Sequence, residues 1–468
     1  MKKIYIQIKT EKQMLIELDQ GHLSNFLIED RSSPRVGDIF SGIVKKIDPR
    51  LNIAFVHIGY EELAYFPLKK DDKIHQGERV IVQVTKLPIK SKRISVTNKI
   101  EITNEFFVYL PFENGIHISN KIDLENHKRL MDLFKNFTSG GLIIRTACEF
   151  ESEQFLLTMF ETLKECWGNI LNNHNQGDKP QLLYRNESVF QRYLSTINLH
   201  DYDEIVCDDI HFTQQLKQQF SSVKDKFNYD RRFHMKKPFP LEMLKEKLTS
   251  PIVKLKNGAN ITINRSEALT LIDVDSAGFR YNKNKENMIL EINKEAAKEI
   301  ASIIKQRQLS GIILIDFINM KRKSEQQQVI EVLTNHLKDD LVPHVIYGFT
   351  KLGLLEMTRK RAFSDVYEHF LTKSELMTDS SFNLHILEEK LLYYQAERVD
   401  AVHLEVKRDL TKWKEKIRQF QDEHQFSFSL FISVNSALQT DFELYKIGDV
   451  NWLLQRMKER QIKVDNLF

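Results

Sequence analysis

The sequence has few cysteines, with Cys148, Cys166 and Cys207 the only three in 468 residues. They are far apart, odd in number and show no CxxC spacing. This pattern excludes a disulfide framework and a cysteine zinc site within one chain. We therefore expect a reduced, intracellular protein.

Long apolar runs and a strong net charge are also missing. The first residues, MKKIYIQIKT, alternate and carry charge, so they lack the apolar core of a signal peptide. No window is apolar enough to span a bilayer, and we expect a cytoplasmic protein without membrane contact. The net charge is only +3, so any basic surface must be local. A hydrophobic fraction of 41% and 468 residues suit a folded protein with several domains.

Five short strands are predicted between residues 35 and 100, separated by turns such as Asp48-Pro49-Arg50. Their segments are GDIFSGIVKKI, LNIAFVHIG, ELAYFP, ERVIVQVTKL and KRISVTNKI. Five antiparallel strands in so short a segment indicate an OB-type barrel.

The segments after the barrel differ in character. Residues 101–195 mix a strand after Ser139-Gly140-Gly141 with a long helix, and residues 196–248 look mostly helical. Between residues 249 and 372, strands and helices alternate and end in a final helix, which predicts an α/β layer. Residues 376–468 form a smaller α+β tail.

Two aspartates follow apolar, β-branched runs in the α/β layer, Asp273 in TLIDVDSAG and Asp316 in GIILIDFINM. The intervening helix has an apolar stripe, and such a strand–helix–strand unit is normally parallel and right-handed. Both carboxylates would then lie at the carboxyl ends of neighbouring strands, where Mg²⁺ could be bound. Asp275 shares the face of Asp273 if its strand continues straight. The alternative is that each aspartate is a turn or helix-cap residue.

The barrel segment combines aromatic and basic residues. OB barrels bind single strands by stacking bases on aromatic rings and contacting phosphates with cations. Phe55 and Tyr65 are candidates for stacking, and alternation directs only one of Tyr65 and Phe66 into the core; we favour Tyr65 outward. The alternative is that the aromatic residues fill the core and the lysines protect strand edges. The basic residues nearby are Lys45, Lys46, Arg50, Lys86, Lys90, Lys92 and Arg93.

Two further segments could bind anions. In LIIRTA, Arg145 has a planar guanidinium suited to phosphate and Thr146 adds a hydroxyl, although both could be ordinary surface residues. The basic run Arg359-Lys360-Arg361 could contact an RNA backbone or form the cationic end of a helix.

These motifs, in this order, resemble the ribonuclease E/G family. The resemblance covers most of the chain and rests on GDIFSGIVKKIDPRLNIAFVHIG, GGLIIRTA, EALTLIDVDSAG, EINKEAAKEIASIIKQRQLSGIILIDFINM and FTKLGLLEMTRKR. It implies a multidomain α/β and α+β architecture. The implied parts are an RNase H-like domain (1–34 and 190–248), an inserted OB-fold barrel (35–100), a 5′-phosphate sensor domain (101–189), a DNase I-like catalytic domain (249–372) and a small C-terminal domain (373–468).

The resemblance also implies roles. Asp273 and Asp316 match the family's catalytic metal ligands, and Arg145 and Thr146 match its 5′-monophosphate sensor. Phe55, Tyr65 and Lys92 match barrel positions that hold single-stranded RNA. The implied activity is Mg²⁺-dependent hydrolysis of AU-rich RNA, leaving 5′-phosphate and 3′-hydroxyl ends, in rRNA processing and mRNA decay.

The chain departs from the family pattern at three points. Asp275 stands where members often have Asn, which could tighten metal binding. The cysteine pair that shares zinc between subunits is absent after Arg361, so we expect no zinc and at most a homodimer without a zinc link. The long tail of the larger members is also absent, so the chain resembles the shorter ribonuclease G form.

Two other functions stay open at this point. A non-catalytic RNA-binding or ribosome-associated factor could retain the fold, because fold does not guarantee function. A metal-dependent DNA nuclease would share the shape of the catalytic domain.

Overall fold

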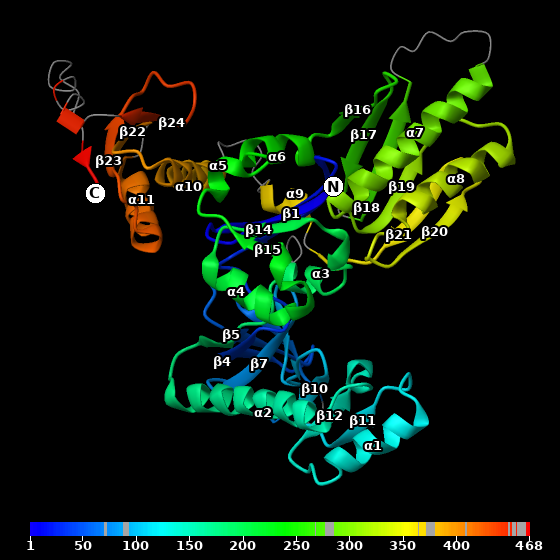
Figure 1. The fold of residues 1–468 in the computed structure, drawn as a ribbon, viewed down its shortest axis with the longest axis vertical. Helices are drawn as coiled ribbons and strands as arrows, with labels where there is room; N and C mark the ends of the chain where they lie inside the picture. Colours follow the sequence, from blue (N-terminus) through cyan, green and yellow to red (C-terminus); the bar gives the residue numbers. More distant parts are fainter. Residues whose placement is uncertain are drawn as a thin grey trace. The chain divides into compact units, whose positions relative to one another are not determined.

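The computed structural model describes residues 1–69, 73–87, 93–266, 268–276, 285–363, 365–370, 380–407, 410–447, 450–451, 455 and 465–468 (Figure 1). These residues form a mixed α/β structure with five sheets, one of them a closed barrel. The chain divides into two compact units, residues 33–188 and residues 1–32 with 189–468. No helix in the described ranges is both long and apolar enough to cross a membrane.

In the unit formed by residues 1–32 and 189–468, the first sheet has the order β15-β14-β1-β2-β3. Its strands are β1 (Lys2–Gln7), β2 (Lys12–Asp19), β3 (His22–Asp30), β14 (Glu204–Cys207) and β15 (Phe227–Tyr229). β1 pairs in parallel with β14, which lies about two hundred residues further along the chain. The sheet is therefore assembled from two distant segments. Helices predominate in residues 196–248, as predicted, but the sequence analysis missed the short strands β14 and β15 within them.

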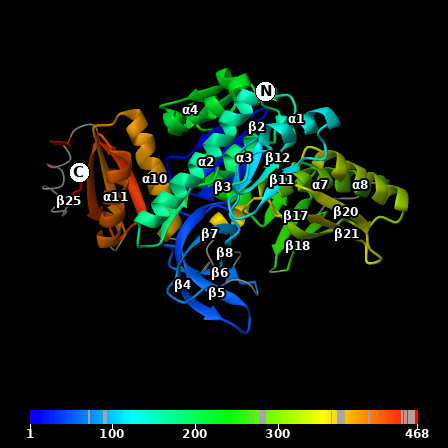
Figure 2. The same cartoon turned by 90° about the horizontal axis from the view of Figure 1, so that it is seen from below.

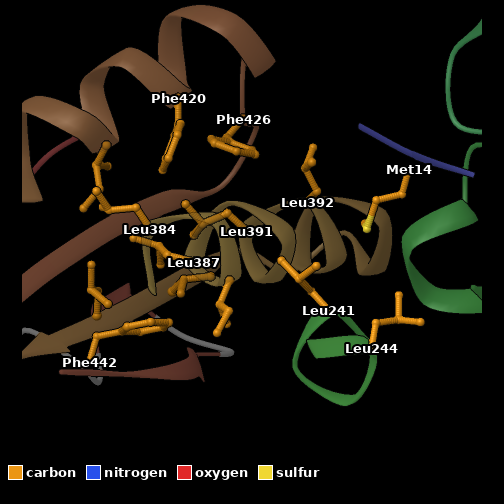
Figure 3. Close-up of a cluster of buried hydrophobic side chains, with 14 of the residues drawn as sticks. Met14, Leu241, Leu244, Leu384, Leu387, Leu391, Leu392, Phe420, Phe426 and Phe442 are labelled. Atoms are coloured by element: carbon orange, nitrogen blue, oxygen red, sulfur yellow. The ribbon is translucent and has the colours of Figure 1, made fainter. Parts of the chain in front are cut away.

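Both faces of this sheet are covered by helices. One face packs on α3 (Val189–Leu194) and α4 (Ile210–Gln219). The other packs on α6 (Leu241–Thr249), α9 (Val366–Phe370) and α10 (Ser380–Glu397), with Met14, Leu241 and Leu391 among the buried side chains (Figure 3). The same apolar cluster continues to Phe420, in a helix of the C-terminal part, and to Phe442 of the C-terminal sheet. The short helix α5 (Phe233–Lys236) lies between β15 and α6 in sequence.

The barrel belongs to residues 33–188. Its strands are β4 (Ile39–Asp48), β5 (Ile53–His57), β6 (Ala64–Pro67), β7 (Arg79–Lys86) and β8 (Ser95–Thr97). Pairing of β4 with β7 closes the ring of strands β4 to β8 (Figure 2). β13 (Gln181–Tyr184) adds to β4. The predicted five-stranded barrel is therefore confirmed and is consistent with an OB-like fold; its core includes Val44, Ala54 and Phe66.

A four-stranded sheet with the order β11-β12-β10-β9 follows the barrel. Its elements are β9 (Ile102–Thr103), β10 (Phe107–Leu110), β11 (Gly115–Ile118) and β12 (Gly141–Ile144), with helices α1 (Leu124–Phe134) and α2 (Glu153–Gln176). Phe107, Phe134 and Phe160 pack edge to face between this sheet and its helices. β11 runs parallel to β12, so the residues that follow both strands lie together.

The second α/β sheet has six strands in the order β16-β17-β18-β19-β21-β20. They are β16 (Ile252–Lys254), β17 (Asn260–Arg265), β18 (Leu269–Asp275), β19 (Gly311–Asp316), β20 (His344–Phe349) and β21 (Leu354–Arg359). Helices α7 (Lys285–Gln306) and α8 (Lys323–Leu337) cover one face, because Ile272, Ile313 and Met357 pack on them (Figure 1). The opposite face carries exposed side chains and holds the candidate site.

One element of this sheet differs from the prediction. The segment LLEMTR was expected in a final helix, but it forms β21, antiparallel to β19. Its alternating pattern of buried Leu355, Met357 and Arg359 with outward residues between them fits a strand of period two. The helix that follows, α9, is only five residues long.

The C-terminal sheet has the order β24-β22-β23-β25. Its elements are β22 (Ala401–Val406), β23 (Ser429–Val434), β24 (Phe442–Ile447), β25 (Asp465–Asn466) and the helix α11 (Leu410–His424). This agrees with the predicted α+β tail. The three cysteines, which lie elsewhere in the chain, are all free, as expected.

Candidate functional site

Asp273 and Asp316 face each other across two neighbouring parallel strands. The register of β18 and β19 makes them direct partners. Alternation directs Ile272, Val274 and Ile315 into the core under α7 and α8, so both aspartates lie on the uncovered face. The predicted convergence of the two positions at the carboxyl ends of the strands is confirmed.

The electrostatics of Asp273 reflect this arrangement. Partial burial raises the pKa of its carboxyl group above the ordinary value, and the negative charges of Asp316 and Asp275 raise it further. When neighbouring carboxylates destabilise the ionised form of a group, a cation shared between them stabilises that ionised form. The charges at this edge of the sheet therefore favour a bound cation.

Asp275 extends the acidic surface. β18 continues to Asp275, two residues beyond Asp273, so the two side chains share the uncovered face. Asp275 pairs in register with Asn260 of β17 and is exposed. Carboxylate oxygens are the ligand type that Mg²⁺ accepts, so the chemistry of this donor set fits that ion, although the ligand atoms of the three aspartates do not all lie within 4.8 Å of one another.

Two other polar residues near this site escaped the sequence analysis. Asn293 of α7 is fully buried; its amide donates to the Ile318 carbonyl oxygen at 2.8 Å and accepts from the Ile318 N–H at 3.1 Å. It thereby fixes the loop two residues beyond Asp316. The sequence signal for Asn293 was its position as a polar residue next to Ile292, which belongs to the apolar stripe of the helix. Glu356 of β21 lies exposed beside Leu314 on the uncovered face, but its segment was interpreted as a helix.

The barrel presents its aromatic residues as alternation predicts. Tyr65 is 36% exposed, whereas Phe66 is 1% exposed and fills the core. Phe55 and Tyr65 are register partners on β5 and β6, and the Arg93 guanidinium lies 4.9 Å from the centre of the Phe55 ring. The pair forms an outward aromatic surface with a cation beside it, suited to a nucleic acid base. Lys92, the third predicted contact, lies outside the described residues.

Arg145 and Thr146 follow β12 and are both exposed. The Arg145 N–H donates to the Phe106 carbonyl oxygen at 2.8 Å, which fixes the backbone. The Thr146 hydroxyl lies 3.0 Å from that of Ser119, the residue after β11. Sequence reasoning missed Ser119, whose place follows from the parallel pairing of β11 with β12. A guanidinium and two hydroxyl groups at one sheet edge could bind a phosphate.

The basic run after β21 does not form one charged surface. Arg359 is 3% exposed, and its guanidinium contacts both carboxylate oxygens of Asp340 at 2.7 and 2.9 Å. It also donates to the Leu309 carbonyl oxygen at 3.0 Å. Arg359 is thus neither an RNA contact nor a helix end, which corrects both alternatives for this position. Lys360 and Arg361 are exposed.

A second group of possible metal ligands lies between α10 and α11. One ligand atom each from Glu388, Glu423 and His424 lies within 4.8 Å of the others. The His424 Nε2 is 2.8 Å from Glu388, which also accepts from the Glu11 N–H at 3.2 Å. Burial raises the pKa of Glu388, and His424 opposes that rise. These contacts describe a buried pair that joins two elements.

Comparison with known proteins agrees with this geometry. The model of the "Ribonuclease E/G family" matches residues 101–362, which include Arg145, Asp273 and Asp316. Ribonuclease E of Synechocystis sp. is 30% identical over 375 residues, 74% of this chain and 55% of that protein. Ribonuclease G of Escherichia coli K12 is 28% identical and that of Haemophilus influenzae 30%, each over 79% of this chain and 81% of the relative.

The chain spans about half the length of the ribonuclease E relatives that it matches, 55% and 52%. It spans 81% of the ribonuclease G relatives. The match includes both strands that carry the aspartate pair. Its extent and its place in the fold lead to one conclusion: the chain is a member of the ribonuclease E/G family.

Proposed function

We propose that this protein is a Mg²⁺-dependent endoribonuclease that hydrolyses single-stranded RNA. The observation that carries the proposal is the register pairing of Asp273 with Asp316 on the uncovered face of the six-stranded sheet. Membership of a ribonuclease family supports RNA as the substrate. The proposal extends to AU-rich substrates, 5′-phosphate and 3′-hydroxyl products, and roles in rRNA processing and mRNA decay.

In the proposed reaction, Asp273 and Asp316 would hold the ion, with Asp275 beside them. Bound Mg²⁺ lowers the pKa of a coordinated water and offsets negative charge on the phosphate. The water would lose one proton to solvent as its oxygen bonds to phosphorus, the bond from phosphorus to the 3′ oxygen would break, and that oxygen would take up a proton from solvent. The carboxylates orient the attacking water, and Asn293 holds the adjoining loop in place.

Residues 33–188 would contribute substrate binding. The Phe55–Tyr65 pair would stack on bases, and Lys92 would contact a phosphate. Arg145 and Thr146, with Ser119, would bind a 5′-monophosphate. The exposure of Tyr65, Arg145 and Thr146 and the partial exposure of Phe55 support these roles.

The test is cleavage of a 5′-labelled AU-rich RNA with and without Mg²⁺, for the wild type, Asp273→Asn and Asp316→Asn. We expect each substitution to abolish cleavage while RNA affinity stays within about twofold, because both side chains lie on the surface of a preformed sheet. The control is Asp339→Asn, an exposed aspartate ahead of β20. Wild-type rates in either active-site variant would refute the mechanism, and RNA binding without any cleavage would favour a binding factor. A DNA oligonucleotide of the same sequence tests the DNA nuclease alternative.

The sensor role needs its own assay. An RNA with a 5′-monophosphate should be cut faster than the same RNA with a 5′-hydroxyl, and Arg145→Ala should remove the difference. Loss of one charge-assisted phosphate contact corresponds to about tenfold. Equal wild-type rates on both RNAs would make Arg145 an ordinary surface residue.

A further inference from the structure

A cavity of about 500 Å³ lies where the barrel meets the four-stranded sheet, within residues 33–188. Lys69 and Lys99 line it, together with Ile81, Phe112 and Glu113. Neither the aspartate site nor the sensor residues belong to it. It joins a cationic border to an apolar wall, the combination that a nucleotide requires.

Two rows of outward side chains lead from the aromatic pair to this cavity. β6 and β8 are parallel, with Tyr65 beside Ser95. Alternation directs Tyr65 and Pro67 of β6 outward in one row, and Ser95 and Thr97 of β8 outward in the next. The exposed residues Lys69, Arg93 and Lys99 flank the ends of these two strands. Lys69 follows Tyr65 by four residues, which span at most about 13 Å of extended chain. The cavity therefore begins a few nucleotides from the aromatic pair, along a surface of hydroxyl and cationic groups.

Phe112 forms the aromatic part of the cavity. The residue is 61% exposed, yet its ring packs edge to face on Trp167, with the ring centres 5.3 Å apart. Trp167 is 9% exposed and fixed in α2. A ring that is held in place and still accessible can stack on a base with little loss of side-chain entropy.

The charges suit a phosphodiester. The Lys99 ammonium group lies 3.0 Å from the Glu113 carboxylate, and this contact raises the pKa of Lys99, so the lysine stays cationic. Lys69 adds a second cation on the same wall. Glu113 can accept a hydrogen bond from the amino group of a base, which none of the cations can do.

We propose that this cavity is a second base-binding subsite for single-stranded RNA, in which Phe112 stacks on a base and Lys69 and Lys99 contact the adjacent phosphates. The proposal rests on the proposed RNA substrate and adds a site to it. It accounts for an exposed phenylalanine whose ring is held by Trp167 in the cavity that Lys69 also lines.

The test is binding of fluorescein-labelled oligouridines to the full chain in EDTA, measured by fluorescence anisotropy. Lengths of about 4 and about 12 nucleotides cover the range that OB folds bind. Phe112→Ala should weaken binding of the longer RNA about tenfold, the effect of one lost base stack, and leave the shorter RNA unchanged. Lys69→Gln should weaken binding of the longer RNA less than Phe112→Ala does, leave the shorter RNA unchanged, and reduce the salt dependence of the longer RNA by about one phosphate contact.

Matched variants separate stacking from apolar bulk. Phe112→Leu should lose as much affinity as Phe112→Ala, whereas Phe112→Trp should keep it. RNA should quench the fluorescence of Phe112→Trp more than that of the wild type, since a base then lies on the new indole ring. Thermal unfolding of each variant checks that the sheet is intact.

The outcomes distinguish this subsite from the nuclease proposal. Wild-type affinity for the longer RNA in both Phe112→Ala and Phe112→Leu would overturn the subsite, even if the protein cleaves RNA. Phe112-dependent binding without Mg²⁺-dependent cleavage would keep the subsite and remove the nuclease. Unquenched fluorescence in Phe112→Trp would also count against stacking.

Discussion

Replacing Asp275 with asparagine tests how the third carboxylate acts on the aspartate pair. Asp275 lies two residues beyond Asp273 on one face of β18, about 6.6 Å along the strand. In a water-like dielectric, two unit charges at this separation interact by about 0.6 kcal/mol. Asparagine keeps the shape of the side chain and removes the charge, so Asp275→Asn isolates this electrostatic effect.

The expected effect concerns the affinity for Mg²⁺. A divalent cation carries twice the charge of a carboxylate. Removing the Asp275 charge at a similar separation should therefore weaken Mg²⁺ binding by about 1.2 kcal/mol, or about eightfold in affinity. The half-saturating Mg²⁺ concentration for cleavage should rise about eightfold in Asp275→Asn, while the rate at saturating Mg²⁺ changes little. The assay is the initial cleavage rate of a labelled AU-rich RNA across a Mg²⁺ titration at constant ionic strength.

The control makes the same change of charge elsewhere. Asp339→Asn alters an exposed aspartate at the opposite edge of the sheet, ahead of β20. It should leave the Mg²⁺ titration unchanged. If Asp275→Asn also leaves it unchanged, the Coulomb argument from the strand geometry is refuted. A lost maximal rate would instead make Asp275 a direct ligand.

Three further predictions concern charged groups in the same sheet. Burial and neighbouring charges raise the pKa of Asp273 above the ordinary aspartate value of about 3.9. On acidification at subsaturating Mg²⁺, the cleavage rate should therefore begin to fall at a higher pH than it would with an ordinary aspartate. For the same reason, the native metal-free protein binds the proton of the Asp273 carboxyl group more tightly than the unfolded chain does. The free energy of unfolding, measured with urea in EDTA, should therefore decrease as the pH rises through the Asp273 pKa, and Asp273→Asn should remove that decrease. Arg359→Met leaves the Asp340 carboxylate buried without its cation and should lower the free energy of unfolding in urea by about 3–5 kcal/mol, whereas the exposed neighbour Lys360→Met should change it little.

The aspartate pair could be predicted from sequence because its signals are local and agree with one another. Two β-branched runs and one helical stripe specify a parallel unit, and the hand of that unit is nearly fixed. The register that makes Asp273 and Asp316 direct partners was not encoded in any one segment. It follows from the packing of Ile272 and Ile315 on the same helices, which only the assembled core reveals.

Tertiary partners decided the elements that the prediction missed. LLEMTR has residues that favour a helix, but the free edge of β19 supplies backbone partners, and Arg359 finds Asp340 and Gln308 in the interior. The strands β14 and β15 are four and three residues long, too short to give a clear period within a helical region. The buried Asn293 shows the same limit, because its partner Ile318 lies twenty-five residues away.

The pairing of β1 with β14 has a consequence for the order of folding during synthesis. The Lys3 ammonium and Glu204 carboxylate, 2.9 Å apart in the finished sheet, are separated by 201 residues of chain. While the ribosome makes residues 33–188, the β1 edge of the first hairpin has no neighbouring strand to accept or donate its backbone hydrogen bonds. That inserted stretch can fold first, so the earliest strands of this protein are among the last to gain their neighbours. An exposed edge during that interval is where a chaperone would act or where aggregation would begin.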